Sequence, residues 1–342
     1  MLKSLALQLL LVPGADALFA PFAKRCGVVF MLHRFRGVDS AADGYDPAAL
    51  RRALAYLRRK KYNVVSIDTL LRCNLEGRPV PDRSIAFTID DGYRDHAEIG
   101  APIFAEFDCP VTTFVTTGFL DEELWFWWDQ IQFVFANSPL LSVCTQLGDR
   151  TLEYSLQSAT ERAAATSDFV DRCKVVANDV KLEAIERLAI AGEVALPAKA
   201  PARYAPMTWD QLRACEERGM TFGPHTVTHP ILSRVSDQQS RWELTESWRR
   251  LSEEARRPVP VFCYPNGGSS DYSQREIATL AEMRFLGAVI GSAGFVSSRA
   301  VRPGQPESFQ TRRFPFPDRL SYLVQSVSGA ERMKYLLRGE PV

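Results

Sequence analysis

The 342-residue sequence has no excess of either charge, no closely spaced cysteines and no long apolar run. Its 41 basic and 41 acidic residues give a formal net charge of zero, so the basic surface typical of nucleic-acid-binding proteins is not expected. The seven cysteines are scattered, which excludes CxxC and zinc-knuckle motifs and favours buried thiols in a reducing compartment. No apolar stretch is long enough to cross a membrane. We therefore expect no nucleic acid partner and no transmembrane segment.

The N-terminus is open to two interpretations. Lys3 precedes an apolar run over residues 5–12, and the small residues at 15–17 resemble a cleavage site, so residues 1–17 could form an export signal. The run is short, contains Gln8 and is followed at once by another apolar patch, which fits an amphipathic helix. We expect a cytoplasmic protein, with export through a signal at about residues 1–17 as the alternative.

Short apolar runs alternate along the chain with amphipathic segments. Strands are expected at 27–32, 62–67, 84–89, 110–117, 220–223, 259–264 and 285–290. Strand alternating with helix is typical of a parallel α/β sheet or barrel. The length allows one large domain, and we expect residues 1–342 to form one.

Capping signals mark where several helices begin. Asp46 before Pro47 suits a helix N-terminus, because Asp caps free backbone N–H groups and Pro fits the first turn. Capping boxes are expected where Ser or Thr is followed three residues later by Gln or Glu, at 208–211, 236–239 and 273–276. A helix over 93–107 should be kinked near Pro102, and one terminal helix is expected over about 319–337.

The alternating rhythm breaks between residues 119 and 206. This segment opens with an aromatic cluster at 125–128 and continues with polar, helix-forming sequence such as 159–188. We expect a mainly helical insertion at 119–206 on the barrel rather than a second domain. Its aromatic residues could stack on sugar rings, although such clusters more often pack an insertion's own core.

The strand at 84–89 ends in two adjacent carboxylates, Asp90 and Asp91, followed by Gly92. In α/β folds, chemistry gathers at the carboxyl ends of strands. Successive strand residues point to opposite faces, so one aspartate could hold a metal while the other handles a proton. The plain structural alternative is a turn with a helix cap.

Two of the four histidines, His225 and His229, are four residues apart, a spacing that predicts one side of a helical turn. Imidazoles at this spacing can bind one metal ion, and two histidines plus one carboxylate leave a coordination position open for water. The absence of Glu after His225 excludes the HExxH protease motif. The alternative is a pair of surface or capping histidines.

Two motifs carry a family resemblance. Residues 88–92 (Thr-Ile-Asp-Asp-Gly) resemble the TFDDG motif, and residues 225–229 (His-Thr-Val-Thr-His) the H-[ST]-x-x-H motif, of NodB-like polysaccharide deacetylases, carbohydrate esterase family 4. The resemblance covers roughly residues 27–118 and 206–315. It implies a distorted (β/α)7 barrel and metal-dependent hydrolysis of N-acetyl groups on a polysaccharide or oligosaccharide. The implied cofactor is a divalent metal, most simply Zn²⁺.

The resemblance also implies roles for individual residues. Asp91, His225 and His229 would be the metal ligands, and Asp90 the general base.

Residues 262–267 resemble the family's third motif, in which a backbone N–H near Asn266 would complete an oxyanion hole. Tyr264 in this motif and Tyr93 after the aspartates are further candidates for substrate contact.

The sequence departs from the family pattern at two functional positions. The arginine usual in the third motif is absent, and Arg313 is the candidate to orient Asp90, unless it is an exposed or structural arginine. No histidine follows His229 to protonate the leaving amine. In the similar poly-N-acetylglucosamine deacetylases an early-strand histidine takes this role, so we expect His33 to be the general acid.

Other functions remain open at this point. An O-deacetylase or another metal amidohydrolase could use the same barrel. A carbohydrate-binding protein without catalysis is the alternative from another class, although it would not need a base beside the metal. A retaining glycosidase needs two carboxyl groups facing each other, which neighbours on one strand do not do.

Overall fold

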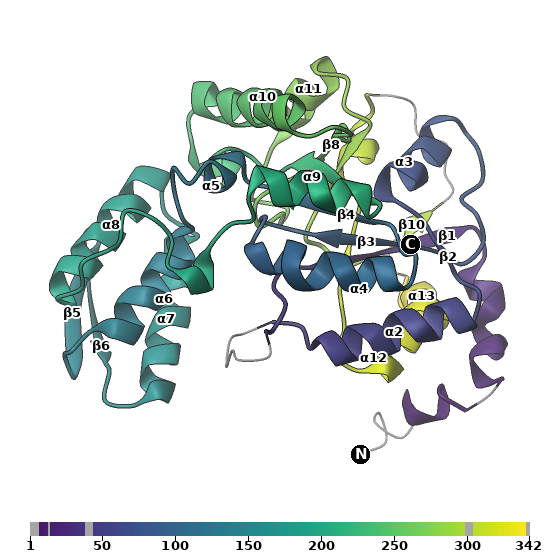
Figure 1. The fold of residues 1–342 in the computed structure, drawn as a ribbon, viewed down its shortest axis with the longest axis horizontal. Coiled ribbons are helices and arrows are strands. Elements are labelled where there is room, and N and C mark those ends of the chain that lie inside the picture. The colour runs from purple at the N-terminus through teal and green to yellow at the C-terminus, as the bar shows by residue number, and fades with distance from the viewer. Residues whose placement is uncertain (1–6, 13, 38–43, 298–303, 340–342) are drawn as a thin grey trace.

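The computed structural model describes residues 7–12, 14–37, 44–297 and 304–339. Strands lie at its centre with helices around them (Figure 1), and the pairing of the strands makes a ring. Neighbours in the main sheet are, in order, β1 (Cys26–Leu32), β3 (Ser84–Ile89), β4 (Val111–Val115) and β7 (Met220–Pro224). A second pair, β8 (Val261–Cys263) and β9 (Gly287–Val289), continues the ring, and β11 (Phe314–Pro315) pairs with β1.

Single bridges close the ring between these sheets. Phe222 bridges Pro258 between β7 and β8, and Val289 bridges Thr311 just before β11. Seven parallel strands therefore surround one core, with two junctions reduced to isolated bridges. This is the distorted (β/α)7 barrel expected from the sequence. A short antiparallel strand, β10 (Val296–Ser297), adds to the start of β1.

The register of β1 and β3 sets the level at which their carboxyl ends lie. The two strands pair in step from Gly27–Ser84 to Leu32–Ile89, and the N–H of Asp90 donates to the carbonyl of Leu32. All six residues of β3 are buried, as expected for a strand covered on both faces. The residues that follow β1 and β3 are therefore held side by side.

The strand expected at 62–67 is much shorter than predicted. Only β2 (Asn63–Val64) is extended, because Ile67 already begins helix α3 (Ile67–Leu75). Ile67 is fully buried and packs in the same apolar cluster as β-strand residues Val29 and Ala86. The Ile67 side chain is therefore buried, as expected for this apolar run, but it belongs to a helix and not to a strand.

The remaining barrel helices lie outside the ring (Figure 1). They are α2 (Pro47–Arg59), α4 (Ala101–Glu106), α9 (Trp209–Glu217), α10 (Asp237–Glu254) and α11 (Gln274–Glu282). Asp46 caps α2 as predicted, and the boxes at 208–211 and 273–276 are reciprocal. At α10 only half the predicted box forms: Ser236 accepts from the N–H of Gln239, but the Gln239 side chain turns to Glu243.

Two helices are interrupted. The predicted kink before Pro102 is a π-helical turn, η2 (His96–Gly100), that runs into α4. The single terminal helix predicted over 319–337 is wrong, because the chain forms α12 (Leu320–Val327) and α13 (Ala330–Leu337). Gly329 separates them with φ of 99°, and a Cβ there would lie 2.4 Å from the carbonyl oxygen of Phe19.

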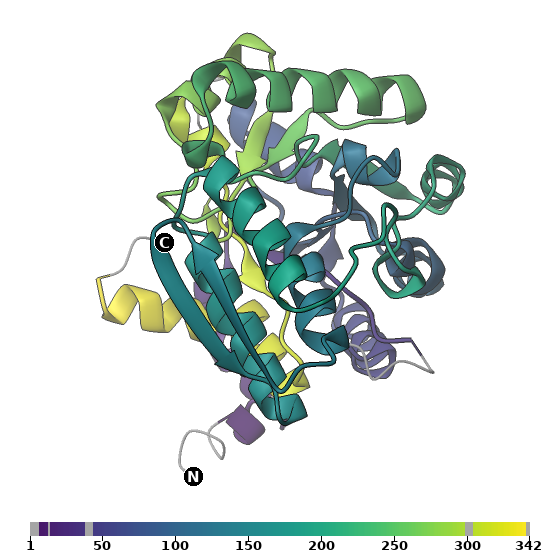
Figure 2. The same ribbon diagram turned by 90° about the vertical axis from the view of Figure 1, so that its left-hand side faces the viewer.

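The insertion packs beside the barrel around an apolar cluster of its own (Figures 1 and 2). After the short α5 (Thr117–Leu120) it contains α6 (Trp127–Asn137), β5 (Ser142–Leu147), β6 (Arg150–Ser155), α7 (Ala159–Cys173) and α8 (Asn178–Ala191). It is mainly helical, as expected, but the β5–β6 hairpin was not predicted. Alternate residues of β5 are buried, which is the pattern of a strand with one wet face.

A short helix near the N-terminus docks against a helix near the C-terminus. The 3₁₀ helix η1 (Ala15–Ala23) lies beside α13, and Arg332 donates to the carbonyls of Phe22 and Lys24. Residues 1–6 and 13 of the possible export signal lie outside the described residues. Within the part of the chain that is described, no helix has the length and apolarity to span a bilayer.

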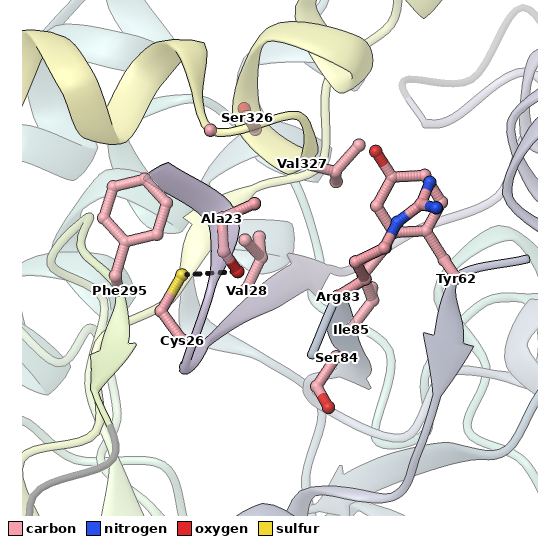
Figure 3. Close-up of a pocket in the computed structure, with 11 residues that line it drawn as sticks. Ala23, Cys26, Val28, Tyr62, Arg83, Ser84, Ile85, Phe295, Ser326 and Val327 are labelled. Atoms are coloured by element: carbon pink, nitrogen blue, oxygen red, sulfur yellow. Dashed lines mark hydrogen bonds between the residues drawn. The ribbon is translucent and has the colours of Figure 1, made fainter. Parts of the chain in front are cut away.

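A small cavity lies at the amino ends of the barrel strands, near η1 (Figure 3). Its lining includes Cys26 and Ser84, the first residues of β1 and β3, and Val327 at the end of α12. The Cys26 thiol donates to the carbonyl of Ala23. Because the cavity lies at the amino ends of the strands, it is remote from the carboxyl ends where the predicted site residues follow.

Candidate metal centre and active site

Six of the predicted residues meet at the carboxyl ends of the barrel strands. They follow or precede strands β1, β3, β7 and β11 and are His33, Asp90, Asp91, His225, His229 and Arg313. Parallel strands bring their carboxyl ends to one rim, so residues up to 223 positions apart in sequence come into contact.

Asp91, His225 and His229 form a compact ligand set. The Asp91 Oδ1 atom lies 3.7 Å from His225 Nε2 and 3.6 Å from His229 Nε2, and the two Nε2 atoms are 3.1 Å apart. Ligands about 2.1 Å from a tetrahedral zinc ion would be about 3.4 Å apart. All three side chains are buried. The residues present therefore fit a divalent metal with an open position.

The two histidines are not on a helix, contrary to the spacing argument. They lie in a loop after β7, which ends at Pro224, and the loop contains two residues with positive φ, Thr226 (66°) and His229 (55°). The Thr226 hydroxyl accepts from the N–H of His229. This tight loop, rather than a helical turn, brings the two imidazoles together.

The imidazoles are held in the state that metal binding requires. His225 Nδ1 donates to the Cys263 carbonyl at 2.7 Å, which leaves its Nε2 lone pair directed at the site. Burial lowers the pKa of His225 to about 4 and that of His229 well below its usual value. Both rings are therefore neutral at pH 7. Burial, and next Asp90, raises the pKa of Asp91 well above its usual value, and a cation would favour its charged form.

Asp90 is held by Arg313 in a buried, two-pronged ion pair. Arg313 Nη1 donates to Asp90 Oδ1 at 2.7 Å and Nη2 to Oδ2 at 2.8 Å. Burial alone would raise the pKa of Asp90, but the guanidinium holds it well below its usual range. Arg313 is itself fixed by the Ile290 carbonyl and the Thr88 hydroxyl. The predicted contact between Arg313 and Asp90 is thus present, and the aspartate cannot rotate freely.

His33 stands at the mouth of the site. Its Nε2 lies 3.9 Å from Asp90 Oδ2, and 45% of its side chain is exposed, against 4% for Asp90. A ring that is half in solvent beside the base can reach a substrate and exchange protons with water. The fourth histidine, His96, is fully buried between aromatic rings and does not reach this group.

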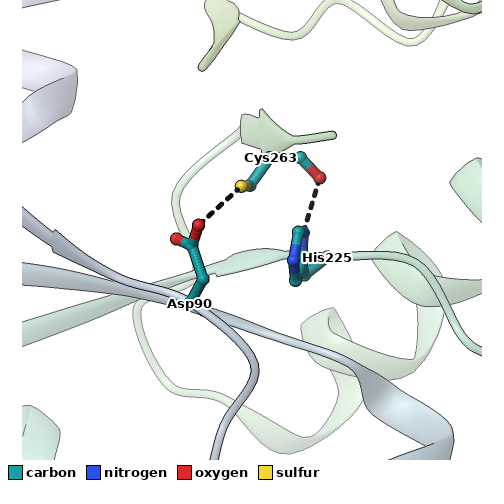
Figure 4. Close-up of side chains that lie close together, drawn as sticks. All are labelled: Asp90, His225 and Cys263. Atoms are coloured by element: carbon teal, nitrogen blue, oxygen red, sulfur yellow. Dashed lines mark hydrogen bonds between the residues drawn. The ribbon is translucent and has the colours of Figure 1, made fainter. Parts of the chain in front are cut away.

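Cys263 lies within the third motif, but the sequence predicts no role for it at the site. Its Sγ lies 3.5 Å from Asp90 Oδ2 (Figure 4). The same sulfur lies 3.3 Å from Arg313 Nη2. With Asp90 and His225 it makes a second compact group. Burial raises the pKa of the Cys263 thiol well above its usual value, and Asp90 is already neutralised by Arg313, so the Asp91 set is the better metal site. Successive side chains of a strand point to opposite faces, and this alternation along β8 is the sequence signal that could have placed Cys263 at the site.

The two predicted tyrosine contacts need correction. The Tyr264 ring is 1% exposed and stacks on Tyr272 with centroids 4.1 Å apart, because it points to the opposite face of β8 from Cys263. The Tyr93 ring is also 1% exposed; its hydroxyl donates to Asp129 at 2.6 Å and accepts from Trp128 Nε1. Neither ring is placed to touch a substrate.

Asn266 lies in the turn after β8, exposed and with φ of 58°. Its place at the carboxyl end of the strand agrees with the sequence prediction. The oxyanion role of the backbone near it stays a prediction.

The insertion supplies one wall of the site. The Trp128 ring packs edge-on against His229 with centroids 4.7 Å apart, and Phe126 stacks on Trp128 and also meets His229. Trp128 is only partly buried. The predicted aromatic cluster therefore both docks the insertion and presents an indole beside a metal ligand.

Comparison with known proteins agrees with this geometry. The sequence model described as polysaccharide deacetylase matches residues 190–286, which include His225, His229 and the third motif. Over these residues the chain is similar to the polysaccharide deacetylase family. The match does not extend to the two aspartates after β3, which the structure adds to the same site.

Two solved structures share the fold. The deacetylase PplD of Streptococcus pyogenes, in complex with acetate, is 15% identical, with 88% of this chain and 98% of that chain covered and a TM-score of 0.57. IcaB from Ammonifex degensii is 14% identical, with 89% and 97% covered and a TM-score of 0.55.

A curated relative is the poly-β-1,6-N-acetyl-D-glucosamine N-deacetylase of Escherichia coli K12, which is 29% identical over 126 residues. That match covers 31% of this chain and only 19% of the relative.

Proposed function

We propose that the chain is a metal-dependent hydrolase that removes N-acetyl groups from an N-acetylated polysaccharide or oligosaccharide. The observation that carries the proposal is the juxtaposition of a neutral two-histidine, one-aspartate ligand set with an arginine-clamped aspartate. A binding protein has no use for the second carboxylate. A hydrolase needs both a site that activates water and a base that takes its proton.

Asp91, His225 and His229 would hold the metal, most simply Zn²⁺. Bound there, the ion would lower the pKa of a water molecule and polarise the acetamide carbonyl.

Asp90 acts as the general base. It accepts a proton from the attacking water while the water oxygen bonds to the acetamide carbon, which becomes tetrahedral. Arg313 keeps the carboxylate ionised and in one orientation, so the base is ready at neutral pH. A backbone N–H near Asn266 would donate to the oxygen that becomes negative.

His33 acts as the general acid. It gives a proton to the sugar nitrogen as the C–N bond breaks, which releases acetate and the free amine. Its half-exposed ring beside Asp90 supports this role, because it can be recharged from solvent.

The relatives and the insertion wall support a proposal for the substrate class. The Escherichia coli relative is named for poly-N-acetylglucosamine, and a glycan of N-acetylglucosamine is the first substrate to test. Trp128, partly exposed beside His229, can stack on a sugar ring and thereby select the glycan.

We propose a cytoplasmic location, with export as the alternative. All seven cysteines are free, which fits a reducing compartment. Residues 15–17 belong to η1, which docks on α13, so removal of residues 1–17 would cut into a packed element.

The test is acetate release from N-acetylglucosamine oligomers and cell-envelope glycans with added zinc. Asp90→Asn should lose release about 10²–10⁴-fold with unchanged metal content. Asp121→Asn is the matched control, since Asp121 is also clamped by an arginine, Arg250, but away from the site.

Full activity of Asp90→Asn would show that the base is wrongly assigned. No release from any N-acetylated glycan by a metal-loaded wild type would refute the reaction, and O-acetylated glycans would be tried next.

A further inference from the structure

The loop that carries the two metal-binding histidines is anchored from outside the barrel. Val227 and Thr228 lie between the histidines, and their backbone N–H groups point toward α10. There both donate to one oxygen, Oε2 of Glu243, at 2.8 and 2.9 Å. Oε1 of the same carboxylate accepts from the Thr228 hydroxyl and from the Gln239 side chain.

Glu243 is an unusual residue for an amphipathic helix. It is fully buried, yet among the described residues no arginine, lysine or histidine nitrogen lies within ion-pair distance of it. Its carboxylate accepts from four neutral donors, three of them on the loop. Burying an ionised carboxylate is costly unless hydrogen bonds satisfy it, so its place depends on the loop having this shape.

The other hydrogen bonds of the loop, such as those of its carbonyl groups, involve atoms other than the N–H groups of Val227 and Thr228. The loop carbonyls of Thr226 and Val227 accept from the N–H groups of Thr117 and Gly118. The carboxylate of Glu243 is the acceptor for the loop's two central N–H groups, on the opposite side of the backbone. With Thr226 and His229 both at positive φ, the backbone is strained and needs such a partner to stay in one conformation.

We propose that Glu243 is a positioning residue for metal binding: it holds the 226–229 loop so that His225 and His229 point at one ion before the ion arrives. It acts through the loop backbone and touches neither metal nor substrate. This inference rests on the metal site of the proposed function, and goes beyond it by assigning the site's preorganisation to α10. Groups behind metal ligands typically contribute 10–100-fold to affinity.

The test compares Glu243 with a second buried glutamate that makes the same kind of hydrogen bonds. Glu216 is also buried and also accepts two consecutive backbone N–H groups, those of Arg256 and Arg257, but in a connection outside the site. Glu243→Leu and Glu216→Leu each leave two amides without their acceptor. Glu243→Gln removes the charge and turns one acceptor oxygen into an NH2 donor, while the other oxygen can still accept from the two amides.

Zinc affinity is measured by competition with a chromogenic chelator, and amide hydrogen exchange is followed in the metal-free proteins. For Glu243→Leu we expect about 100-fold weaker zinc binding, and for Glu243→Gln about tenfold. Exchange should accelerate at Val227 and Thr228. In Glu216→Leu, exchange should accelerate at residues 256 and 257 instead, with zinc affinity within twofold of wild type.

Unchanged zinc affinity in both Glu243 variants would overturn the positioning role. An equal loss in Glu216→Leu would do the same, because the effect would then be general destabilisation. If Glu243→Leu does not fold, Glu243→Gln decides. Failure of the wild type itself to bind zinc would refute the metal site, and this outcome is distinct from a defect confined to the variants.

Discussion

Replacing Arg313 with methionine should destabilise the protein in a strongly pH-dependent way. Asp90 and Arg313 are 3% and 1% exposed and joined by two short hydrogen bonds. Removing one partner of a buried pair typically costs about 3–5 kcal/mol, because the other charge is left without compensation. We expect a loss of this size at pH 8 in Arg313→Met, measured by urea unfolding with a chelator present.

The sign of the pH dependence follows from Asp90. In the wild type its folded pKa lies below the unfolded value, so the ionised pair contributes fully at pH 5 and at pH 8. Without Arg313, burial places the folded pKa above the unfolded value. The variant then loses stability as pH rises, and its deficit should be smaller at pH 5 than at pH 8.

A double variant distinguishes the cost of the unpaired Asp90 charge from the cost of losing the other hydrogen bonds of Arg313. Asp90→Asn in the Arg313→Met background removes the stranded charge and should restore about 2–3 kcal/mol at pH 8, with the deficit now independent of pH. Loss of the bonds to Ile290 and Thr88 remains in both. Equal deficits at the two pH values, or no recovery in the double variant, would refute the ion-pair reasoning.

Three further predictions concern single side chains. Lys181→Met removes a buried ammonium that lies 4.9 Å from the Trp127 ring centroid and whose pKa is lowered by burial to about 8. Between pH 8 and 10.5 the stability of the wild type should therefore rise relative to that of the variant, by up to about 3 kcal/mol. Thermal melts that give parallel pH curves for the two proteins would contradict this. His33→Gln should reduce acetate release about 100-fold or more without loss of metal, as measured by turnover and metal analysis; near-normal turnover would remove it as the acid. His229→Ala should abolish stoichiometric zinc binding, and retained stoichiometric metal would place the site elsewhere.

Local patterns in the sequence predict much of the barrel. The buried run at 84–89 and the reciprocal capping boxes depend on neighbours within a few residues, and both are found where expected. The break at Gly329 was missed because it arises from close approach to Phe19, more than 300 residues away in the chain. The β5–β6 hairpin was missed because its alternation is short and sits among polar, helix-forming sequence.

The site could be predicted in composition but not in geometry. The His225–His229 spacing identified the ligand pair, yet a loop with two positive φ angles replaces the expected helical turn. No role was predicted for Cys263, although it lies within the third motif, or for Glu243, because the importance of both comes from contacts with residues on other strands and loops. Arg313 was identified only through the family resemblance.

The long separation between Asp90 and Arg313 has a consequence for how the protein is made. The proposed ligands Asp91, His225 and His229 leave the ribosome well before Arg313, which lies 223 residues after Asp90. Until the last barrel strand is synthesised and closes against β1, Asp90 has no cation beside it, and water must solvate it. A nascent chain halted before residue 311 would contain the three proposed metal ligands but lack a closed barrel and the arginine that fixes Asp90. The proposed hydrolytic activity would therefore require synthesis of the chain through β11.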